Sequence, residues 1–369
     1  MSSVVVSIPE QKPYEVKVEQ GILSSIGTVL RNLDNNRRAL IVTDTEVGKR
    51  YAYQVKSALM KSDYTVSVIT IPSGESAKSI ECAHEVWQAM VQCHLSRDSI
   101  VLALGGGVVG DLAGFCASTF MRGLRVVQVP TTLLSMVDSS VGGKTAINLD
   151  EGKNLVGTFW QPILVCADVA ALATLPEREW VCGCAEIAKT AAIDSSNFFF
   201  WLVEHAKDLS NRLPEITQEA ILRSIEIKAS VVARDTQELK GVRESLNYGH
   251  TLAHAIEKIA GYGVYSHGEA VAQGMRFAAR LGAACIQTDL DFISAQDALL
   301  DSLNLLPLPF KADPEEIYDV MLTDKKVRSD KIRFVLPQSV GQWQVVSPDK
   351  DLILEHLSAW QTSLKEGVR

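Results

Sequence analysis

Short apolar runs alternate with amphipathic segments through the first half of the chain. Runs rich in β-branched residues predict strands at residues 4–8, 14–18, 38–43, 65–71, 99–104 and 125–129, with the first two forming a hairpin. Apolar residues at helical spacing predict helices at residues 51–61, 79–94 and 109–119. This alternation predicts an α/β domain with a mostly parallel, doubly wound sheet and helices on both faces.

The pattern changes after residue 174. Helical spacing of apolar residues predicts helices at residues 180–193, 195–206, 216–238, 251–260 and 269–288. Only residues 331–346, with Gly341 near the middle, are rich in β-forming residues. We therefore predict two domains, an α/β domain over residues 1–174 and a mainly helical domain over residues 175–369.

Charge and cysteine usage narrow the class of protein. A formal charge of −8 argues against binding nucleic acid, because phosphate backbones are held by basic surfaces. Seven cysteines without any CxxC pair indicate reduced thiols and a cytoplasmic protein. The N-terminus does not resemble a signal peptide, and uncharged runs end after about a dozen residues, which is too short for a membrane span.

A glycine-rich turn in the first half indicates nucleotide binding. Gly105, Gly107 and Gly110 fit the G-x-G-x-x-G pattern between a strand and a helix, where the backbone can approach a pyrophosphate. The acidic residue usually found about 20 positions later is absent, but Asp44 ends an earlier strand and could accept hydrogen bonds from a ribose. The alternative is a glycine turn that serves only strand–helix packing.

The first half holds three further polar segments, of which the first follows a predicted strand. Ser73-Gly-Glu75, with Lys78, opens a helix and by itself is more typical of a helix cap than of a ligand loop. The segment from Asp138 to Thr145 lacks the first glycine of a phosphate loop, which excludes that motif. We interpret residues 138–145 and 152–154 as two polar, glycine-bearing loops. Two such loops in succession indicate a functional role rather than an ordinary exposed surface.

The second half carries candidate metal ligands. Glu186 and Lys189 lie one helical turn apart among small and apolar residues, so their charges are predicted to be buried and to need partners, although a solvated ion pair is the alternative. His250 and His254 are also one turn apart, and His267 follows. A carboxylate and two imidazoles can form a catalytic divalent-metal site, and N/O ligands suit Zn²⁺, with Co²⁺ or Fe²⁺ as alternatives. Spacing does not decide which two of the three histidines bind.

Taken together, these segments resemble the 3-dehydroquinate synthase family of sugar-phosphate cyclases. The resemblance covers nearly the whole chain and rests on motifs in the same order: Gly74-Glu75 with Lys78, residues 105–111, 120–123, 129–132, 137–145 and 152–154, Ala185-Glu186 with Lys189, residues 247–254, 267–269 and 324–326. It implies conversion of 3-deoxy-D-arabino-heptulosonate 7-phosphate to 3-dehydroquinate and phosphate. The implied steps are transient oxidation by bound NAD⁺, phosphate elimination, reduction, ring opening and aldol closure. The resemblance also implies a homodimer in which Arg122 reaches the substrate phosphate of the neighbouring subunit.

The resemblance assigns roles to individual residues. It implies metal binding by Glu186, His250 and His267. It implies catalytic roles for Lys144, Lys189, Asn247 and His254, and substrate binding by Arg122, Asp138, Asn154, Lys228, Arg243 and Lys325, with Lys326 as the alternative to Lys325. It implies an NAD site made by Asp44, Ser73, Gly74, Glu75, Lys78, Gly106, Gly107, Val108, Asp111, Thr131, Thr132, Lys144, Lys153 and Thr174.

Three other functions remain as alternatives. Another sugar-phosphate cyclase, making a valiolone-type or amino-sugar-derived ring, would use the same catalytic core with a different pocket. A metal-dependent alcohol dehydrogenase would accumulate NADH in proportion to substrate. A nucleotide-binding regulatory module needs neither metal ligands nor a basic pocket, so the candidate site residues disfavour it.

Overall fold

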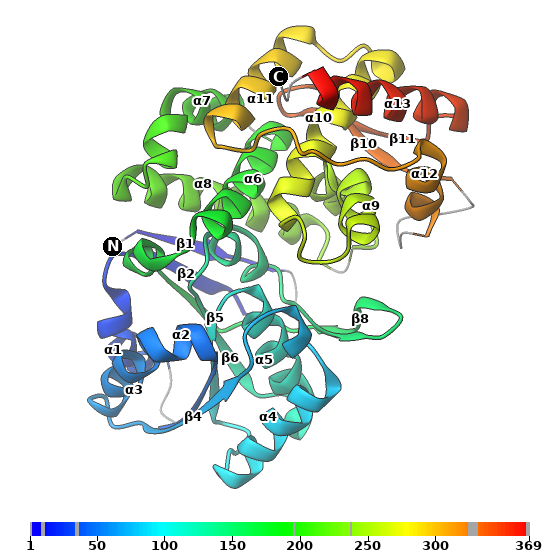
Figure 1. The fold of residues 1–369 in the computed structure, drawn as a ribbon. Coiled ribbons are helices and arrows are strands. Elements are labelled where there is room, and N and C mark those ends of the chain that lie inside the picture. Colours follow the sequence, from blue (N-terminus) through cyan, green and yellow to red (C-terminus); the bar gives the residue numbers. More distant parts are fainter. Residues whose placement is uncertain are drawn as a thin grey trace. The chain divides into compact units, whose positions relative to one another are not determined.

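The chain forms two compact units. The computed structural model describes residues 2–8, 12–33, 37–194, 196–236, 238–323 and 331–366 (Figure 1). The first unit comprises residues 1–175 and 221–237, and the second comprises residues 176–220 and 238–369. The sequence placed residues 175–369 in one domain, whereas the structure groups residues 221–237, which include the last two thirds of helix α8 (Pro214–Arg234), with the first unit.

A seven-stranded sheet with the strand order β1-β2-β9-β6-β5-β3-β4 forms the centre of the first unit. Strands β1 and β2 are antiparallel, as the predicted hairpin requires, and the other neighbouring strands are parallel. The strands are β1 (Ser3–Val6), β2 (Tyr14–Glu19), β3 (Arg38–Asp44), β4 (Thr65–Ile71), β5 (Ile100–Gly105), β6 (Arg125–Pro130) and β9 (Leu164–Asp168). The helical segments are η1 (Ile22–Ser24), α1 (Ile26–Arg31), α2 (Thr45–Val47), η2 (Gly48–Ala52), α3 (Tyr53–Met60), η3 (Glu75–Ala77), α4 (Ile80–Gln92), α5 (Gly107–Thr119), η4 (Phe120–Arg122), η5 (Ser135–Ser139) and η6 (Val169–Thr174).

Alternate residues of the central strands face two different hydrophobic cores. Leu40 and Val101 pack in one core with residues of α4 and α5, whereas Ile41 and Leu102 pack in the other with residues of α1 and α3. Because successive side chains of a strand point to opposite faces, helices cover both faces of the sheet. The predicted doubly wound α/β fold is therefore confirmed.

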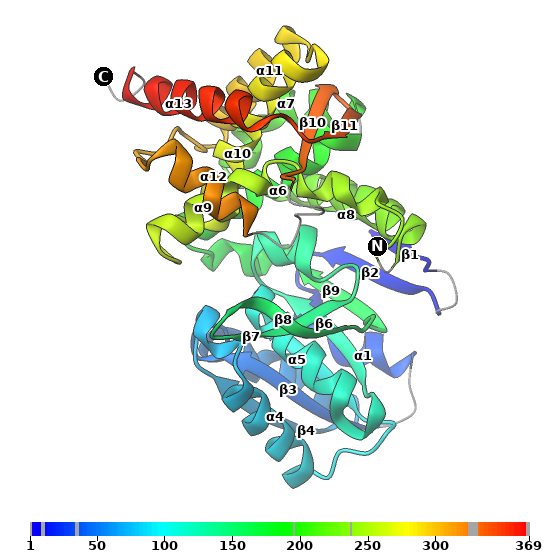
Figure 2. The same ribbon diagram turned by 90° about the vertical axis from the view of Figure 1, so that its right-hand side faces the viewer.

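Several features of the first unit differ from the sequence prediction, and α1 was not predicted. The helix after β3 begins at Thr45 rather than at residue 51, because Oδ1 of Asp44 accepts hydrogen bonds from the backbone N–H groups of Glu46 and Val47. Strand β9 was not predicted. The two predicted loops at residues 138–145 and 152–154 were also wrong in part, because β7 (Lys144–Leu149) and β8 (Gly152–Phe159) form an antiparallel hairpin that makes its own two-stranded sheet (Figure 2).

The second unit is mainly helical, as predicted. Its helical segments are α6 (Glu177–Asp194), α7 (Ser196–Ser210), η7 (Val242–Asn247), α9 (His250–Ala260), α10 (His267–Ile286), α11 (Leu290–Ser302), α12 (Pro314–Leu322) and α13 (Lys350–Glu366). The predicted β-rich run forms the hairpin β10 (Phe334–Ser339) and β11 (Gln342–Val346), with Gly341 in the turn. The sequence did not predict α11, α12 or α13, and it extended α8 four residues beyond its end.

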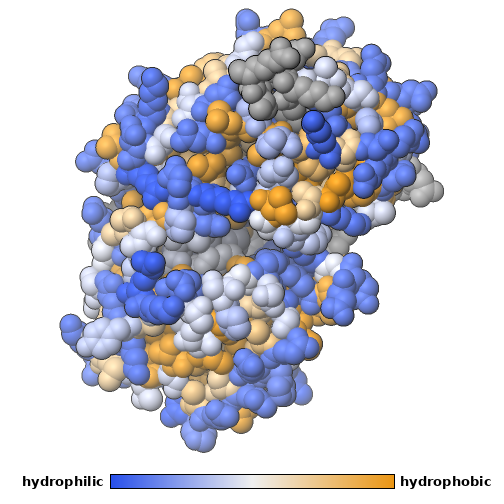
Figure 3. Space-filling view, viewed as in Figure 1, coloured by the Kyte–Doolittle hydropathy of each residue, from blue (hydrophilic) through white to orange (hydrophobic). Residues whose placement is uncertain are grey.

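The cysteines are unpaired, as the composition predicted, and the face of the molecule shown in Figure 3 is mostly hydrophilic. On this face, hydrophilic side chains separate small apolar patches. All seven cysteines are free, and five of them are buried. In the part of the chain that the structure describes, no helix combines the length and apolar character needed to cross a membrane.

Candidate active site

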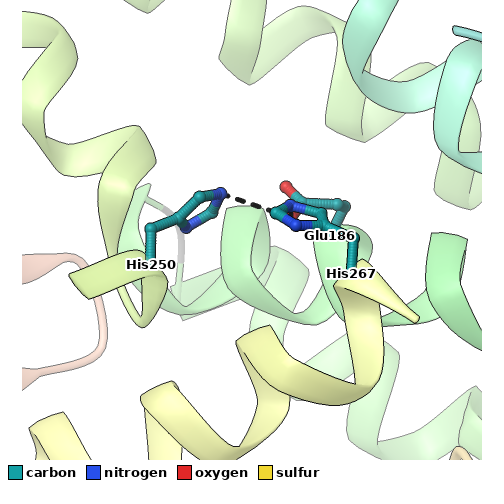
Figure 4. Close-up of side chains that lie close together, drawn as sticks. All are labelled: Glu186, His250 and His267. Carbon is teal, nitrogen blue, oxygen red and sulfur yellow. Dashed lines mark ion pairs between the residues drawn. The ribbon is translucent and has the colours of Figure 1, made fainter. Parts of the chain in front are cut away.

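Three side chains of the second unit converge on one point. Glu186 projects from α6, His250 from the start of α9 and His267 from the start of α10 (Figure 4). One ligand atom from each lies within 4.8 Å of the others. Nε2 of His250 and Nε2 of His267 lie 3.7 Å and 3.5 Å from Oε1 of Glu186. Of the alternatives left by the sequence, the geometry therefore favours His250 and His267 as the imidazole pair.

Hydrogen bonds on the far side of each imidazole fix which nitrogen faces the cluster. Nδ1 of His250 lies 3.0 Å from the carbonyl oxygen of Tyr248, and Nδ1 of His267 lies 3.2 Å from Oε2 of Glu257. Because carbonyl and carboxylate oxygens only accept, each Nδ1 carries a proton and donates it. The Nε2 atoms of both rings are then directed at Glu186, and once each Nε2 is free of a proton this donor set suits a divalent cation.

The backbone around His250 is held by close packing. Gly249, which precedes it, has φ +79°, and a Cβ at this position would lie 2.8 Å from the carbonyl oxygen of Val271 in α10. Tyr248 is fully buried, and its hydroxyl lies 2.6 Å from Oε1 of Gln296 and 3.2 Å from the carbonyl oxygen of Met275. The carbonyl that orients His250 therefore belongs to a residue whose backbone N–H bonds to Ser245 and whose hydroxyl bonds to Gln296.

A capping box places His267 in the first turn of α10. The Ser266 side chain accepts a hydrogen bond from the backbone N–H of Glu269, and Oε2 of Glu269 lies 2.6 Å from the backbone nitrogen of Ser266. Arg178 of α6 also contacts this carboxylate, at 3.3 Å. The segment His267-Gly-Glu269 is thus a helix start that holds one metal-ligand candidate against α6.

Glu186 is the most buried charged group of the cluster. Only 1% of its surface is exposed, and it forms an ion pair with Lys189, one turn along α6. Burial by itself raises the pKa of Glu186, but Lys189 and His267 outweigh that effect and lower it to about 2. Burial lowers the pKa of His267, whereas hydrogen bonds to Glu186 and Glu257 raise it to about 9. Without a cation, one proton therefore occupies the centre of the cluster.

Metal binding is expected to release that proton. Below pH 9 the metal-free His267 is protonated, and a cation must displace the proton from Nε2. The apparent Kd for Co²⁺ or Zn²⁺ should therefore rise by about tenfold for each pH unit below about 9 and should level off above it. Calorimetric titration at pH 7.5 in two buffers of different ionisation enthalpy should show release of about one proton per bound ion.

Glu257→Gln provides the matched comparison. This change removes one of the carboxylates that raise the pKa of His267, so it should reduce the number of protons released at pH 7.5. It should also weaken metal binding by about 10-fold to 100-fold, as loss of a hydrogen bond to a ligating imidazole does. Metal binding without proton release in the unaltered protein would contradict the electrostatic account of this cluster.

Polar residues of the first unit gather where neighbouring parallel strands end. The helix that connects β3 to β4 covers one face of the sheet. The helices that connect β4 to β5 and β5 to β6 cover the other face. The direction in which successive strands are added therefore reverses between β3 and β5. Asp44 ends β3, Gly105 ends β5, and Gly106 and Gly107 lead directly into α5. Ligands of open α/β sheets bind at the carboxyl ends of strands at such a reversal. Thr131 and Thr132 follow β6, and Thr174 ends η6 after β9.

Two buried lysines of the first unit connect several of the predicted residues. Nζ of Lys78 lies 2.7 Å from Oδ2 of Asp111, and it also contacts Oδ1 of Asn154. Burial raises the pKa of Asp111, although the ammonium of Lys78 acts in the opposite direction. Nζ of Lys228, on α8, lies 2.6 Å from Oδ1 of Asp138 and 2.5 Å from its carbonyl oxygen. These contacts show that the two lysines have partners that hold them in place.

Comparison with known proteins decides the family. Residues 68–182 match the family described as 3-dehydroquinate synthase N-terminal, and residues 183–327 match the family described as 3-dehydroquinate synthase C-terminal. The chain belongs to the 3-dehydroquinate synthase family. The 3-dehydroquinate synthase of Rhodopirellula baltica is 49% identical to it over 308 residues, which are 83% of this chain and 82% of that relative.

Two solved structures share the fold over almost the whole chain. A 2-deoxy-scyllo-inosose synthase complexed with carbaglucose-6-phosphate, NAD⁺ and Co²⁺ is 26% identical, with a TM-score of 0.85 over 99% of this chain and 100% of that one. A 2-epi-5-epi-valiolone synthase from Streptomyces hygroscopicus subsp. jinggangensis 5008, with NAD⁺ and Zn²⁺ bound, is 28% identical, with a TM-score of 0.87 over 97% of this chain and 99% of that one. The predicted resemblance and fold class are therefore confirmed.

Several predicted site residues of this 3-dehydroquinate synthase family member lie beside the groups already described. His254 lies next to both metal-ligand candidates, with ring centroids 5.7 Å from His250 and 6.4 Å from His267, but outside the cluster of three. Arg243 is buried in η7, with Nε 3.6 Å from Glu238, and Asn247 ends the same segment. The predicted Lys325, and its alternative Lys326, lie outside the described residues.

Sequence reasoning missed three residues that position the predicted ones. Tyr248 and Glu257 orient the two imidazoles, and Asn148 bonds to Glu75 and to the backbone of Asn154. Glu257 could have been found, because it lies two helical turns after His250 and therefore on the same face of α9. Nothing local in the sequence marks the other two.

Proposed function

We propose that this chain catalyses the conversion of 3-deoxy-D-arabino-heptulosonate 7-phosphate to 3-dehydroquinate and phosphate. The match of both family regions carries this proposal, and the convergence of Glu186, His250 and His267 supports it. The predicted cofactors are NAD and one divalent metal ion. Two related cyclases contain NAD⁺ with Co²⁺ or Zn²⁺, and the carboxylate and two imidazoles of this cluster fit either ion.

When bound, the cofactors would supply Lewis-acid chemistry, from the metal ion, and reversible hydride transfer, from NAD⁺. Glu186, His250 and His267 are the proposed metal ligands. Lys189 lies against the Glu186 carboxylate and adds positive charge where the substrate's oxygens would bind. Among described residues, the proposed substrate contacts are Arg122, Asp138, Lys144, Asn154, Lys228, Arg243 and Asn247.

The residues of the first unit support the proposed cofactor site. Asp44 uses Oδ1 to cap the following helix, and its second carboxylate oxygen can accept hydrogen bonds from ribose hydroxyls. The glycines at 106 and 107 begin α5, where backbone N–H groups favour a pyrophosphate. The remaining proposed NAD contacts are Ser73, Gly74, Glu75, Lys78, Val108, Asp111, Thr131, Thr132, Lys144, Lys153 and Thr174.

A turnover experiment tests the proposal. With the heptulosonate phosphate, Zn²⁺ or Co²⁺ and substoichiometric NAD⁺, many equivalents of phosphate and 3-dehydroquinate should form, and almost no NADH absorbance should appear. NADH in proportion to substrate would indicate an alcohol dehydrogenase. Phosphate release only from a different sugar phosphate would indicate another cyclase and would refute the proposed substrate.

A further inference from the structure

Asn148 connects two loops that are far apart in the sequence. It lies on β7, and its Nδ2 is 2.8 Å from Oε1 of Glu75. Its Oδ1 is 2.9 Å from the backbone nitrogen of Asn154, on β8. Its backbone N–H donates to the carbonyl oxygen of Lys78, at 2.7 Å. One side chain and its peptide thus bond to three residues, all of which are proposed ligand contacts.

Asn148 bonds to residues in unfavourable states, one with a left-handed backbone and one with a buried charge. Asn154 has φ +56°, in the left-handed region that non-glycine residues seldom adopt. The Lys78 side chain is 4% exposed, and its ammonium lies between Asp111, Asn154 and Glu75, the last at 3.8 Å. Glu75 is therefore held between an ammonium and the Asn148 amide, and Asn154 is held by backbone and side chain together.

The same residues line open space. Glu75, Lys78 and Asn148 contribute to the wall of a pocket of about 330 Å³ in the first unit. Side chains that line a pocket bind a ligand most tightly when packing and hydrogen bonds fix them before the ligand arrives. An amide is also the suitable group here, because it donates to one partner and accepts from the other.

We propose that Asn148 is a positioning residue that joins the Glu75–Lys78 loop to the Asn154 strand and so sets the NAD site. The inference rests on the proposed function, because Glu75 and Lys78 are proposed NAD contacts. Asn148 itself acts through these neighbours. Loss of its side chain leaves the metal cluster of the second unit intact and weakens NAD⁺ binding.

A set of substitutions at two positions tests the bridge. Asn148→Ala removes both side-chain bonds and should raise the Kd for NAD⁺, measured by calorimetry, by about tenfold. Asn148→Asp keeps an acceptor for Asn154 but opposes two carboxylates at Glu75, so it should raise the Kd further. When Asn148→Asp is combined with Glu75→Gln, the amide of residue 75 can donate to the carboxylate of residue 148, which is the reverse of the original hydrogen bond. The double variant should then bind NAD⁺ within about threefold of Glu75→Gln alone, which is a non-additive result.

Thr158→Val is the matched control on the same hairpin. Thr158 bonds to Thr145 and to Ser118, both at 2.8 Å, so this change also removes side-chain hydrogen bonds of the β7–β8 sheet. It should lower the melting temperature as Asn148→Ala does, with the Kd for NAD⁺ unchanged. Equal NAD⁺ affinity in the unaltered protein and both Asn148 variants, or additive effects in the double variant, would overturn the bridging role. Absence of NAD⁺ binding by the unaltered protein would instead overturn the proposed function, and the inference with it.

Discussion

Alanine at His250 or His267 is expected to abolish activity by removing the metal ion. Each change leaves Glu186 with a single imidazole, and two ligands do not hold a divalent ion in competition with water. Because a bound ion contributes several kcal/mol of transition-state stabilisation, the loss in kcat should be about a thousandfold or more. Metal content measured by elemental analysis after gel filtration should fall to background in both variants.

His254→Ala separates the two possible roles of the third histidine. Its ring lies beside both ligand candidates but outside their cluster, so the variant should retain the metal ion and lose rate. A general acid or base contributes about 100-fold to 10,000-fold, which is the expected range for the fall in kcat. Loss of metal from His254→Ala, together with retention by His267→Ala, would reverse the assignment of ligands.

The sequence predicted the parts of this site that share one local segment. Glu186 and Lys189 lie one turn apart on a helix of small residues, so their common face and burial follow from spacing alone. The carboxyl-end positions of Asp44 and the glycine turn likewise follow from strand–helix alternation. The local sequence pattern is sufficient to predict a site residue when one helix or the end of one strand determines its position.

The choice between His254 and His267 depended on packing between helices. Spacing did not decide between them: His250 and His254 share one face of α9, whereas His267 is the alternative from another segment. The alternative depends on where α10 begins, which the capping box of Ser266 and Glu269 sets, and on the close approach of α10 to Gly249. The approach of α10 to Gly249 joins Gly249 and Val271, which are 22 positions apart, and a single sequence does not display such a contact.

The β7–β8 hairpin was missed for a related reason. Its strand β8 has mostly exposed side chains, including Leu155 and Val156, so it lacks the alternation of buried and exposed positions that marks a half-buried strand. The glycines and lysines of residues 142–144 and 152–154 resemble loop signals instead. Backbone pairing with a partner strand decides the structure here, and that pairing brings Asn148 to Asn154.

Arg122 is held in an exposed position by a strained turn. Met121 and Arg122 have φ of +50° and +69°, and Gly123 follows with φ +122°. A Cβ at Gly123 would lie 2.3 Å from the ring of Trp160, so only glycine permits this turn. Within the part of the chain that the structure describes, Arg122 has no ion pair or hydrogen bond. Strain that presents a side chain without a partner is typical of a functional position.

A second copy of the chain is the proposed recipient of Arg122. Exposed apolar side chains lie near this turn in the sequence or beside Trp160, among them Met121 at 48% and Phe159 at 42% exposure. We propose a homodimer in which the guanidinium binds the substrate phosphate of the neighbouring subunit, since its planar fork matches phosphate oxygens. Arg122→Ala should lower kcat/KM by about a hundredfold or more. Arg31→Ala, an exposed arginine that pairs with Asp63 at 3.5 Å, should have no such effect.

Mixed dimers distinguish action within one subunit from action across two. Arg122→Ala and His250→Ala should each be nearly inactive alone. A dimer of one of each contains one site with intact metal ligands from the first chain and an intact arginine from the second. Random exchange makes half of the dimers mixed, so restored activity should approach about one quarter of the unaltered level. Exchange confirmed by native mass spectrometry without any return of activity would refute the role in trans, because an arginine acting within its own subunit cannot complement its neighbour.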